Sequence, residues 1–196
     1  DISAIHFGSI ALAQEPTAGT LDSFMTRMAD DKVISLDPNI RPSIIPDRRV
    51  WLDRFAGQLA RADIVKASAE DVAWIEGEGA DLETVARRWS RAGPAFALIT
   101  DGGHGVHVAR GGQHVFMPAL RVAVSDTIGA GDTFQAAILA RLDEQGLLAK
   151  PTLRMLSDDR LADAIRFAIA AAAITCTRRG ADLPRRDEVD ALLMAA

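Results

Sequence analysis

Short apolar runs alternate with amphipathic helical patterns along the first half of the chain. The apolar runs predict strands at residues 4–7, 33–36, 63–65 and 96–100. The helical patterns lie between them, at residues 21–28, 46–60, 68–77 and 82–91. In the second of these helices we expect Val50, Phe55 and Leu59 to face the interior. This regular strand–helix order predicts an α/β fold with a parallel sheet covered by helices.

The pattern changes in the second half of the chain. Apolar alternation at residues 106–109 and 114–117, around Arg110-Gly111-Gly112, predicts a β-hairpin. Residues 121–124 are expected to form a further short strand, and residues 134–142 a helix with one apolar face. A long helix follows at residues 161–176, where apolar side chains keep i, i+3, i+4, i+7 spacing. We expect residues 146–157 to be the most loosely held connection, and the chain to form one domain.

Composition narrows the functional classes. The 196 residues are 48% hydrophobic and 25% charged, which is typical of a globular domain. A net charge of −5, without any block of lysine or arginine, disfavours a nucleic-acid-binding surface. No apolar run reaches the length of a membrane span, and Cys176 is the single cysteine, which favours a reducing compartment. We therefore expect a cytoplasmic protein that binds neither nucleic acid nor membrane.

The segment from Asp126 to Thr133, with the sequence DTIGAGDT, is the strongest chemical signal in the chain. A glycine-rich turn that opens a helix leaves backbone N–H groups pointing outward, and together with the helix dipole they attract a phosphate or an oxyanion. Asp132 stands where its carboxylate can take a proton from an alcohol attacking that phosphate. The alternative is an ordinary helix start with Asp126 or Asp132 as its N-cap. The complete string favours phosphate chemistry.

This segment resembles the C-terminal signature of the PfkB (ribokinase-like) family of carbohydrate kinases. Four other segments are similar to landmarks of that family, in the family's order: Asp37–Pro42 (DPNIRP), Val65–Asp71 (VKASAED), Ile99–Val106 (ITDGGHGV) and Ala171–Ala181 (AAAITCTRRGA). They resemble, in turn, the D-x-N-x-R segment of fructokinase-type members, the N-x-x-E motif, the nucleotide-side T-x-G-x-x-G-V turn and the closing A-A-A…T-R-x-G-A segment. On these residues the chain is identified as a member of the fructokinase-type branch.

The resemblance implies a ribokinase-like α/β fold, with a central, mostly parallel sheet flanked by helices. It also implies that the N-terminal third of such a kinase is absent from this chain, including the glycine-rich sugar-binding segment and the β-sheet lid. The chain opens at Asp1 and enters a strand almost at once. We therefore expect a fragment, the nucleotide-binding body of a sugar kinase, and a homodimer only for the full-length protein.

The family's signature and nucleotide turn supply the first group of implied site residues. Asp132 would be the catalytic base, and the N–H groups of Gly129, Ala130 and Gly131 would form an anion hole that tightens as charge builds on the phosphoryl oxygens. The residues expected to line ATP are Thr100, Gly102 and Gly105.

Two segments that follow strands supply a second group on the nucleotide and substrate side. Asn39 and Arg41 come directly after a predicted strand, where an open α/β sheet places ligand groups. Arg41 would bind phosphate or sugar oxygens through its planar guanidinium; the alternative is a surface arginine between two prolines. Ser68 belongs to this group through the family's N-x-x-E motif, which here has the form Ser68-x-x-Asp71.

Two metal sites are also implied. Asp71 would order water around Mg²⁺; alternatively, Ser68 is a helix N-cap and Asp71 its N3 residue, and both roles are compatible. A K⁺ site would use the Asp126 side chain and the backbone carbonyls of Ile128, Thr175, Arg178 and Gly180. The loop after Gly180 is shorter than in ribokinases, which leaves K⁺ binding open. In either case we expect a helix C-cap at Gly180, followed by a proline stop.

These residues together imply ATP-dependent phosphorylation of a sugar hydroxyl. Fructose is the first expectation, and it depends on the DPNIRP and S-x-x-D segments alone. The alternatives are another PfkB kinase, for 2-keto-3-deoxygluconate or a nucleoside, and a truncated nucleotide-binding module without activity. We expect residues 1–196 alone to phosphorylate sugars weakly or not at all.

Overall fold

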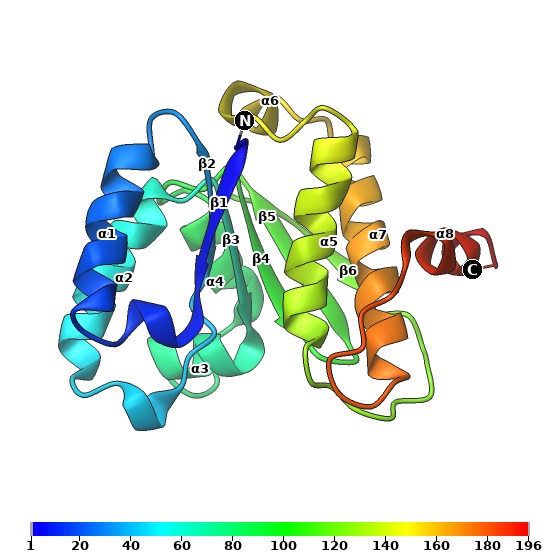
Figure 1. The fold of residues 1–196 in the computed structure, drawn as a ribbon, viewed down its shortest axis with the longest axis horizontal. Coiled ribbons are helices and arrows are strands. Elements are labelled where there is room, and N and C mark those ends of the chain that lie inside the picture. The colour runs from blue at the N-terminus through cyan, green and yellow to red at the C-terminus, as the bar shows by residue number, and fades with distance from the viewer. Residues whose placement is uncertain (1, 196) are drawn as a thin grey trace. The chain divides into compact units, whose positions relative to one another are not determined.

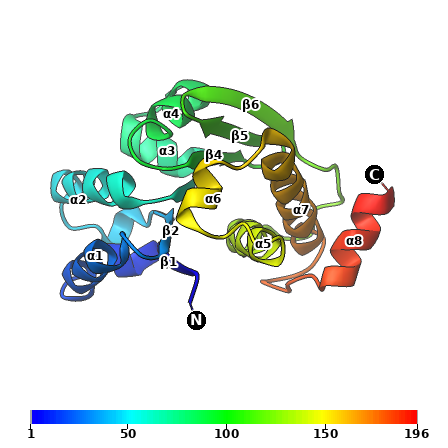
Figure 2. The ribbon, with the colours of Figure 1, turned by 90° about the horizontal axis from the view of Figure 1, so that it is seen from above.

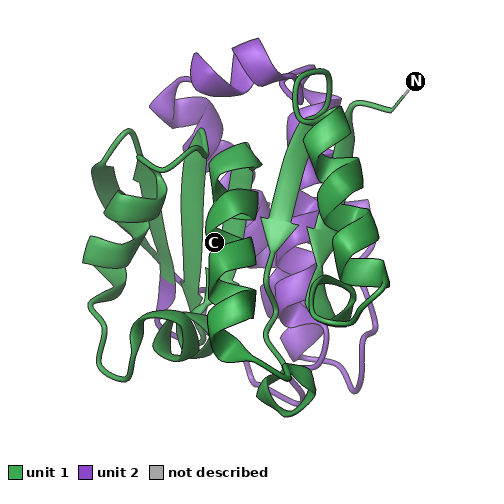
Figure 3. Ribbon diagram, turned by 90° about the vertical axis from the view of Figure 1, so that its left-hand side faces the viewer, with its two compact units in different colours: residues 1–102, 106–117 green, residues 103–105, 118–196 purple. Residues whose placement is uncertain are grey.

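The computed structural model describes residues 2–195, and the chain divides into two compact units (Figure 3). The first unit comprises residues 1–102 and 106–117, and the second comprises residues 103–105 and 118–196. Within residues 2–195, no helix has the length and the apolar composition that crossing a bilayer requires.

The first unit is built on a six-stranded sheet whose strands follow chain order (Figure 1). The strands are β1 (Ala4–Gly8), β2 (Val33–Asp37), β3 (Ile64–Ser68), β4 (Phe96–Asp101), β5 (Gly105–Arg110) and β6 (Gln113–Pro118). β1 to β4 pair in parallel, with Gly8 opposite Asp37 and Ser68 opposite Thr100. β5 and β6 are joined by a two-residue turn, the connection of an antiparallel hairpin. The mixed, mostly parallel sheet confirms the predicted α/β fold class.

Four helices of the first unit lie on one face of this sheet (Figure 2). They are α1 (Thr17–Met28), α2 (Arg48–Arg61), α3 (Ala69–Glu76) and α4 (Leu82–Trp89), and two short 3₁₀ turns, η1 (Ser9–Leu12) and η2 (Pro42–Ile44), precede α1 and α2. Alternate strand residues enter the core beneath the helices, because successive side chains of a strand point to opposite faces. The buried strand residues of this core are Phe7, Ile34, Leu36, Val65, Ala67, Ala97, Ile99 and Ala109.

The buried face of α2 differs from the expected one at its beginning. Phe55 and Leu59 are buried as predicted, but Val50 is 55% exposed and Trp51 is buried in its place. Trp51, Phe55 and Leu59 are spaced four residues apart, so they share one face of a helix with 3.6 residues per turn. The Trp51 ring stacks on Phe55 with the centroids 5.2 Å apart. The larger aromatic surface therefore decides which residue of the first turn faces the core.

The second unit is helical. Its helices are α5 (Ala130–Glu144), α6 (Lys150–Arg154), α7 (Asp158–Cys176) and α8 (Arg186–Ala195). α5 and α7 pack along each other (Figure 1), and polar contacts fix both ends of the pair. At one end the buried hydroxyls of Thr133 and Thr175 are 3.1 Å apart; at the other, Arg141 Nε donates to Asp163 Oδ2 at 2.8 Å. The predicted apolar stripes of both helices are largely buried between these contacts.

Two expectations about connecting segments are wrong. Residues 121–124 do not form a strand, and Val124 is 63% exposed. β-branched residues favour a strand only where a neighbouring strand offers pairing and packing, and this segment pairs with none of the six described strands. Residues 146–157 are also more ordered than predicted, because they contain α6 and bury Leu153 and Leu156.

Candidate active site

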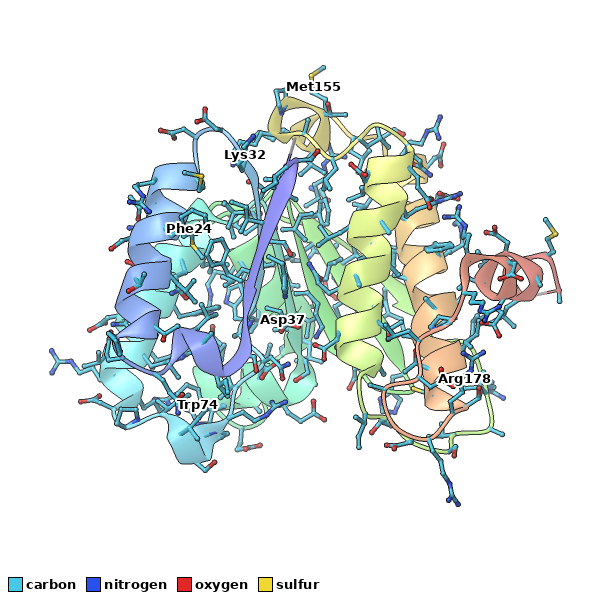
Figure 4. All side chains as sticks on the ribbon, viewed as in Figure 1. Phe24, Lys32, Asp37, Trp74, Met155 and Arg178 are labelled. Atoms are coloured by element: carbon cyan, nitrogen blue, oxygen red, sulfur yellow. The ribbon has the colours of Figure 1, made fainter. Side chains whose placement is uncertain are left out.

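A buried ion pair joins the carboxyl end of β2 to the middle of β3 in the first unit. Asp37 is the last residue of β2, and its Oδ2 accepts a hydrogen bond from Lys66 Nζ of β3 at 2.7 Å. Asp37 is labelled in Figure 4; the two side chains are 2% and 5% exposed. Burial raises the pKa of the Asp37 carboxyl, and the Lys66 ammonium opposes that rise. The negative charge of Asp37 and the positive charge of Lys66 therefore neutralise each other inside the first unit.

The loop after β2 is held by two carboxylates. Asn39 N–H donates to Asp37 Oδ1 at 3.1 Å, and Ile40 N–H donates to Asp71 Oδ1 at 2.7 Å. Asn39 adopts a φ of +38°, a conformation that asparagine tolerates better than most residues. Arg41 Nη1 donates to Asn39 Oδ1 at 2.7 Å, and Arg41 is exposed. The predicted residues Asn39 and Arg41 thus form one locally braced turn that offers polar groups to solvent.

Ser68 and Asp71 form a capping box at the beginning of α3. Asp71 N–H donates to Ser68 Oγ at 3.1 Å, and Ser68 N–H donates to Asp71 Oδ2 at 2.9 Å. This confirms the expected N-cap and N3 roles. Both Asp71 oxygens accept hydrogen bonds, and the residue is 6% exposed. The role of Asp71 in Mg²⁺ binding stays a prediction. In that role the same carboxylate would also hold the backbone at Ile40 and at Ser68.

The predicted nucleotide turn follows β4. Thr100 lies opposite Ser68 in the parallel register, and its hydroxyl is 3.4 Å from the carbonyl oxygen of Ala67. Gly102 has a φ of +48°, and a Cβ added there would meet no atom within 4 Å. Gly105 also has a positive φ, of 148°. Glycine is therefore required here by backbone conformation, and the space beside Gly102 is open within the described residues.

The signature segment begins α5 in the second unit. Gly129 is the N-cap of α5 with a left-handed φ of +79°, and its carbonyl accepts from Thr133 N–H at 2.8 Å. Ala130 N–H donates to the Thr127 carbonyl at 3.2 Å, so this member of the predicted anion hole already has an acceptor. Asp132 lies in the first turn and is exposed. The helix N-terminus thus presents its dipole and a carboxylate together at the surface of the second unit.

Asp126 ties the entry of α5 to the exit of α7. Its Oδ2 accepts from Gly180 N–H at 2.9 Å and its Oδ1 from Ile128 N–H at 3.0 Å. These two hydrogen bonds lower the pKa of the Asp126 carboxyl. The expected helix C-cap at Gly180 is wrong: α7 ends at Cys176, with Thr177 as its C-cap. Gly180, at a φ of +68°, instead turns its N–H toward Asp126.

The predicted K⁺ ligands surround the same loop, but several have other partners. The Thr175 carbonyl accepts from Arg178 N–H at 3.1 Å, and the Gly180 carbonyl accepts from Asp182 N–H at 2.9 Å. The Arg178 side chain, labelled in Figure 4, donates to the Leu183 carbonyl at 3.2 Å. Each carbonyl oxygen keeps a second lone pair. Binding of K⁺ at Asp126, Ile128, Thr175, Arg178 and Gly180 therefore stays a prediction.

Sequence reasoning missed Asp37 and Lys66 as members of the site. The signal was present, because Lys66 directly follows the strand expected at residues 63–65 and stands between Val65 and Ala67, which are both apolar. A lysine is almost never buried without a partner of opposite charge. The partner comes from 29 residues earlier, and only the parallel register of β2 and β3 brings it alongside.

Replacing Gly129 with alanine is expected to distort the signature loop. An added Cβ would lie 2.9 Å from the Ala181 Cβ, and the φ of +79° is unfavourable for any residue with a side chain. The start of α5 must then shift against the loop that follows α7. A misplacement of about 1 Å can cost about 10²-fold in rate, so we expect kcat/KM of the full-length protein to fall by about that factor.

Gly146 provides the matched control at the other end of α5. Its φ is +68°, but a Cβ there would meet no atom within 4 Å. Gly146→Ala therefore carries the conformational strain without the collision. Steady-state kinetics and thermal unfolding of both variants separate the two effects, and equal kinetic losses would show that the Gly129–Ala181 contact is unimportant.

Comparisons with known proteins identify the family of the chain. The chain matches the pfkB family carbohydrate kinase profile over residues 2–188. It is 40% identical to a fructokinase of Rhizobium leguminosarum bv. trifolii over 161 residues, which are 82% of this chain and 49% of that protein. The chain thus spans about half the length of that relative.

Two solved structures are similar to the chain. A fructokinase from Xylella fastidiosa with bound ATP superposes with a TM-score of 0.86 at 27% identity, over 97% of this chain and 61% of that one. The aminoimidazole riboside kinase of Salmonella enterica, in complex with aminoimidazole riboside and an ATP analogue, gives a TM-score of 0.85 at 26% identity, over 98% and 63%. The family profile covers nearly all of the described residues and includes every motif discussed above, so this chain belongs to the pfkB family of carbohydrate kinases.

Proposed function

We propose that the protein to which this chain belongs transfers the γ-phosphoryl group of ATP to a hydroxyl of fructose. The observation that carries this proposal is the first turn of α5, where the exposed Asp132 carboxylate follows the left-handed Gly129. Phosphoryl transfer depends mainly on positioning and on stabilising charge at the transferring group. A helix N-terminus with a neighbouring carboxylate offers both an anion site and a proton acceptor.

In the proposed reaction, Asp132 accepts the proton of the attacking sugar hydroxyl. The Gly129–Gly131 turn and the dipole of α5 stabilise negative charge on the phosphoryl oxygens as the bond to the leaving ADP oxygen breaks. Asp126 holds this turn through the N–H groups of Ile128 and Gly180. It acts as a positioning residue for the anion site.

The turn after β4 and the loop after β2 are proposed to bind the nucleotide and the acceptor. The open turn at Thr100, Gly102 and Gly105 suits close approach of ATP to backbone groups. The braced Asn39–Arg41 turn offers a guanidinium to phosphate or sugar oxygens. Mg²⁺, with Asp71 ordering its water shell, would neutralise charge on the phosphates, and K⁺ at the Asp126 loop would add to the local positive potential.

Fructose is proposed over other acceptors on sequence similarity. The two superpositions do not separate a fructokinase from a nucleoside kinase, because their TM-scores are 0.86 and 0.85. The 40% identity is to a fructokinase, and it includes the body that carries Asp37–Pro42. The acceptor class follows from that likeness.

An ADP-release assay of the full-length protein against a panel of acceptors tests the substrate. The panel contains fructose, 2-keto-3-deoxygluconate and aminoimidazole riboside, each with MgATP. We expect kcat/KM for fructose to exceed the others by at least about tenfold, the scale on which one displaced binding group discriminates. A nucleoside or a keto-acid as the best acceptor would overturn the choice of fructose. Residues 1–196 alone serve as the comparison, for which we expect little or no turnover.

A further inference from the structure

Two histidines face each other across the β5–β6 hairpin. His107 Nδ1 lies 3.1 Å from His114 Nε2, and the ring centroids are 5.2 Å apart with an interplanar angle of 29°. Because side chains alternate between the two faces of a strand and the turn is Gly111–Gly112, His107, His114 and Phe116 lie on one face of the hairpin. The Phe116 ring packs edge-on to His107 at 4.9 Å. None of these residues takes part in the candidate active site.

The separation of the two nitrogens suits a shared metal ion. Zn²⁺ and similar ions bind imidazole nitrogen at about 2.0–2.1 Å. When two such bonds meet at the metal at an angle between the square-planar and the tetrahedral value, the two ligating nitrogens are about 3 Å apart. The observed 3.1 Å lies in that range. The near-parallel rings bring both nitrogens to the same side of the hairpin.

A carboxylate already orients one of the two rings. His114 Nδ1 is 3.4 Å from Glu83 Oε2, and in the tautomer that carries its proton on Nδ1 the Nε2 lone pair faces His107. Glu83 is itself fixed, because its Oε1 accepts from Arg87 Nε at 2.9 Å and from Arg87 Nη2 at 2.7 Å. Histidines that bind metals commonly donate their other ring N–H to a carboxylate in this way.

The charges around the pair favour a cation. Asp81, the N-cap of α4, and Glu83 in the first turn of that helix both interact electrostatically with His114, and so does Arg87 of the same helix. Burial lowers the pKa of His114, with His107 and Arg87 acting in the same direction and Glu83 opposing them. Two carboxylates and one guanidinium thus act on the ring, and this local excess of negative charge favours a cation.

We propose that His107 Nδ1 and His114 Nε2 bind one divalent transition-metal ion, of the class that includes Zn²⁺ and Ni²⁺. Imidazole ligands select this class over Mg²⁺ and Ca²⁺. Binding needs a free lone pair on His107 Nδ1 and on His114 Nε2, so a proton held on either nitrogen must move to the other nitrogen of its ring or leave to water. The described residues contain no group of three or more His, Cys, Asp or Glu side chains that could hold a metal. Water would therefore complete the coordination.

Calorimetric titration of residues 1–196 with Ni²⁺ at neutral pH tests the site. We expect saturable binding of one ion per chain, lost in His107→Gln and in His114→Gln. Glu83→Gln should weaken binding by about 10-fold or more, because the partner that orients His114 is removed. His104→Gln is the control for adventitious surface binding, and it should bind as the unchanged chain does. Circular dichroism of each metal-free variant shows whether it is folded.

A second measurement needs no substitution. Ni²⁺ should protect His107 from chemical modification of its imidazole, as mapped by mass spectrometry, and leave His104 reactive. Unchanged Ni²⁺ affinity in both folded histidine variants would overturn the proposal. Equal protection of His104 and His107 would do the same, because it would show unspecific binding.

Discussion

Asp132→Asn in the full-length protein is expected to lower kcat by about 10²–10⁴-fold, the range that a positioned general base contributes. Asparagine is nearly isosteric with aspartate, so the first turn of α5 keeps its shape, but the amide cannot accept the proton of the sugar hydroxyl. ATP affinity should stay close to that of the unchanged protein, since the anion site uses backbone groups at Gly129–Gly131. Steady-state kinetics with fructose and an equilibrium titration with an ATP analogue measure the two quantities separately.

Asp143→Asn is the matched control for this variant. Asp143 lies in the same helix, is exposed like Asp132, and loses the same charge on substitution. It stands near the C-terminal end of α5, away from the anion site. We expect near-normal kcat for Asp143→Asn. Retention of more than a few per cent of kcat by Asp132→Asn would contradict the role of Asp132 as the base.

The sheet of the first unit was predictable because each strand has a local signal. Apolar runs bounded by helical patterns determine β1 to β4, and the Gly111–Gly112 turn determines the β5–β6 hairpin. The strand expected at residues 121–124 was wrong because strand formation needs a partner, which no local pattern reports. Val50 was misassigned for a similar reason: which of two adjacent apolar residues faces the core depends on packing with Phe55.

The site was predictable where its residues are contiguous. The capping box of Ser68 and Asp71 follows from one short segment, and the structure has it. The N-cap of α5 is Gly129, not Asp126 or Asp132, the two candidates that the sequence offered. Contacts between segments that are distant in the sequence were harder to predict. Gly180 was expected to cap a helix, but it donates to Asp126, which lies 54 residues earlier. The Asp37–Lys66 pair likewise depends on strand register, so its partners could not be matched from either segment alone.

Lys66→Met is expected to give the largest loss of stability in the first unit. Methionine fills much of the volume of the lysine stem, so the principal change is that Asp37, 2% exposed, loses its counter-ion. Removing one partner of a buried pair typically costs about 3–5 kcal/mol. We expect the free energy of unfolding at neutral pH to fall by about that amount. Chemical denaturation of Lys66→Met and the unchanged chain measures the difference.

Two further substitutions show whether the effect comes from a buried charge. Arg61 pairs with Asp22 at 3.5 Å with 35% and 32% of the side chains exposed, so Arg61→Met should cost only about 0–1 kcal/mol. Asp37→Asn combined with Lys66→Met removes both charges and keeps an oxygen that can accept from Asn39 N–H. The double variant should therefore be more stable than Lys66→Met. If it were as unstable as the single variant, lost packing rather than an unpaired carboxylate would be the cause.

The pH dependence of Lys66→Met distinguishes the same two causes by sign. Burial raises the pKa of Asp37 above its ordinary value of 3.8 even beside Lys66, and loss of the ammonium removes the main opposing interaction. A carboxyl with a raised pKa in the folded state binds more protons than it does when unfolded. Its contribution to stability is therefore greatest below the unfolded pKa and is lost as pH rises through the folded pKa. The stability difference between Lys66→Met and the unchanged chain should shrink as the pH is lowered from neutral toward 5, whereas a packing defect would give a difference that does not change with pH.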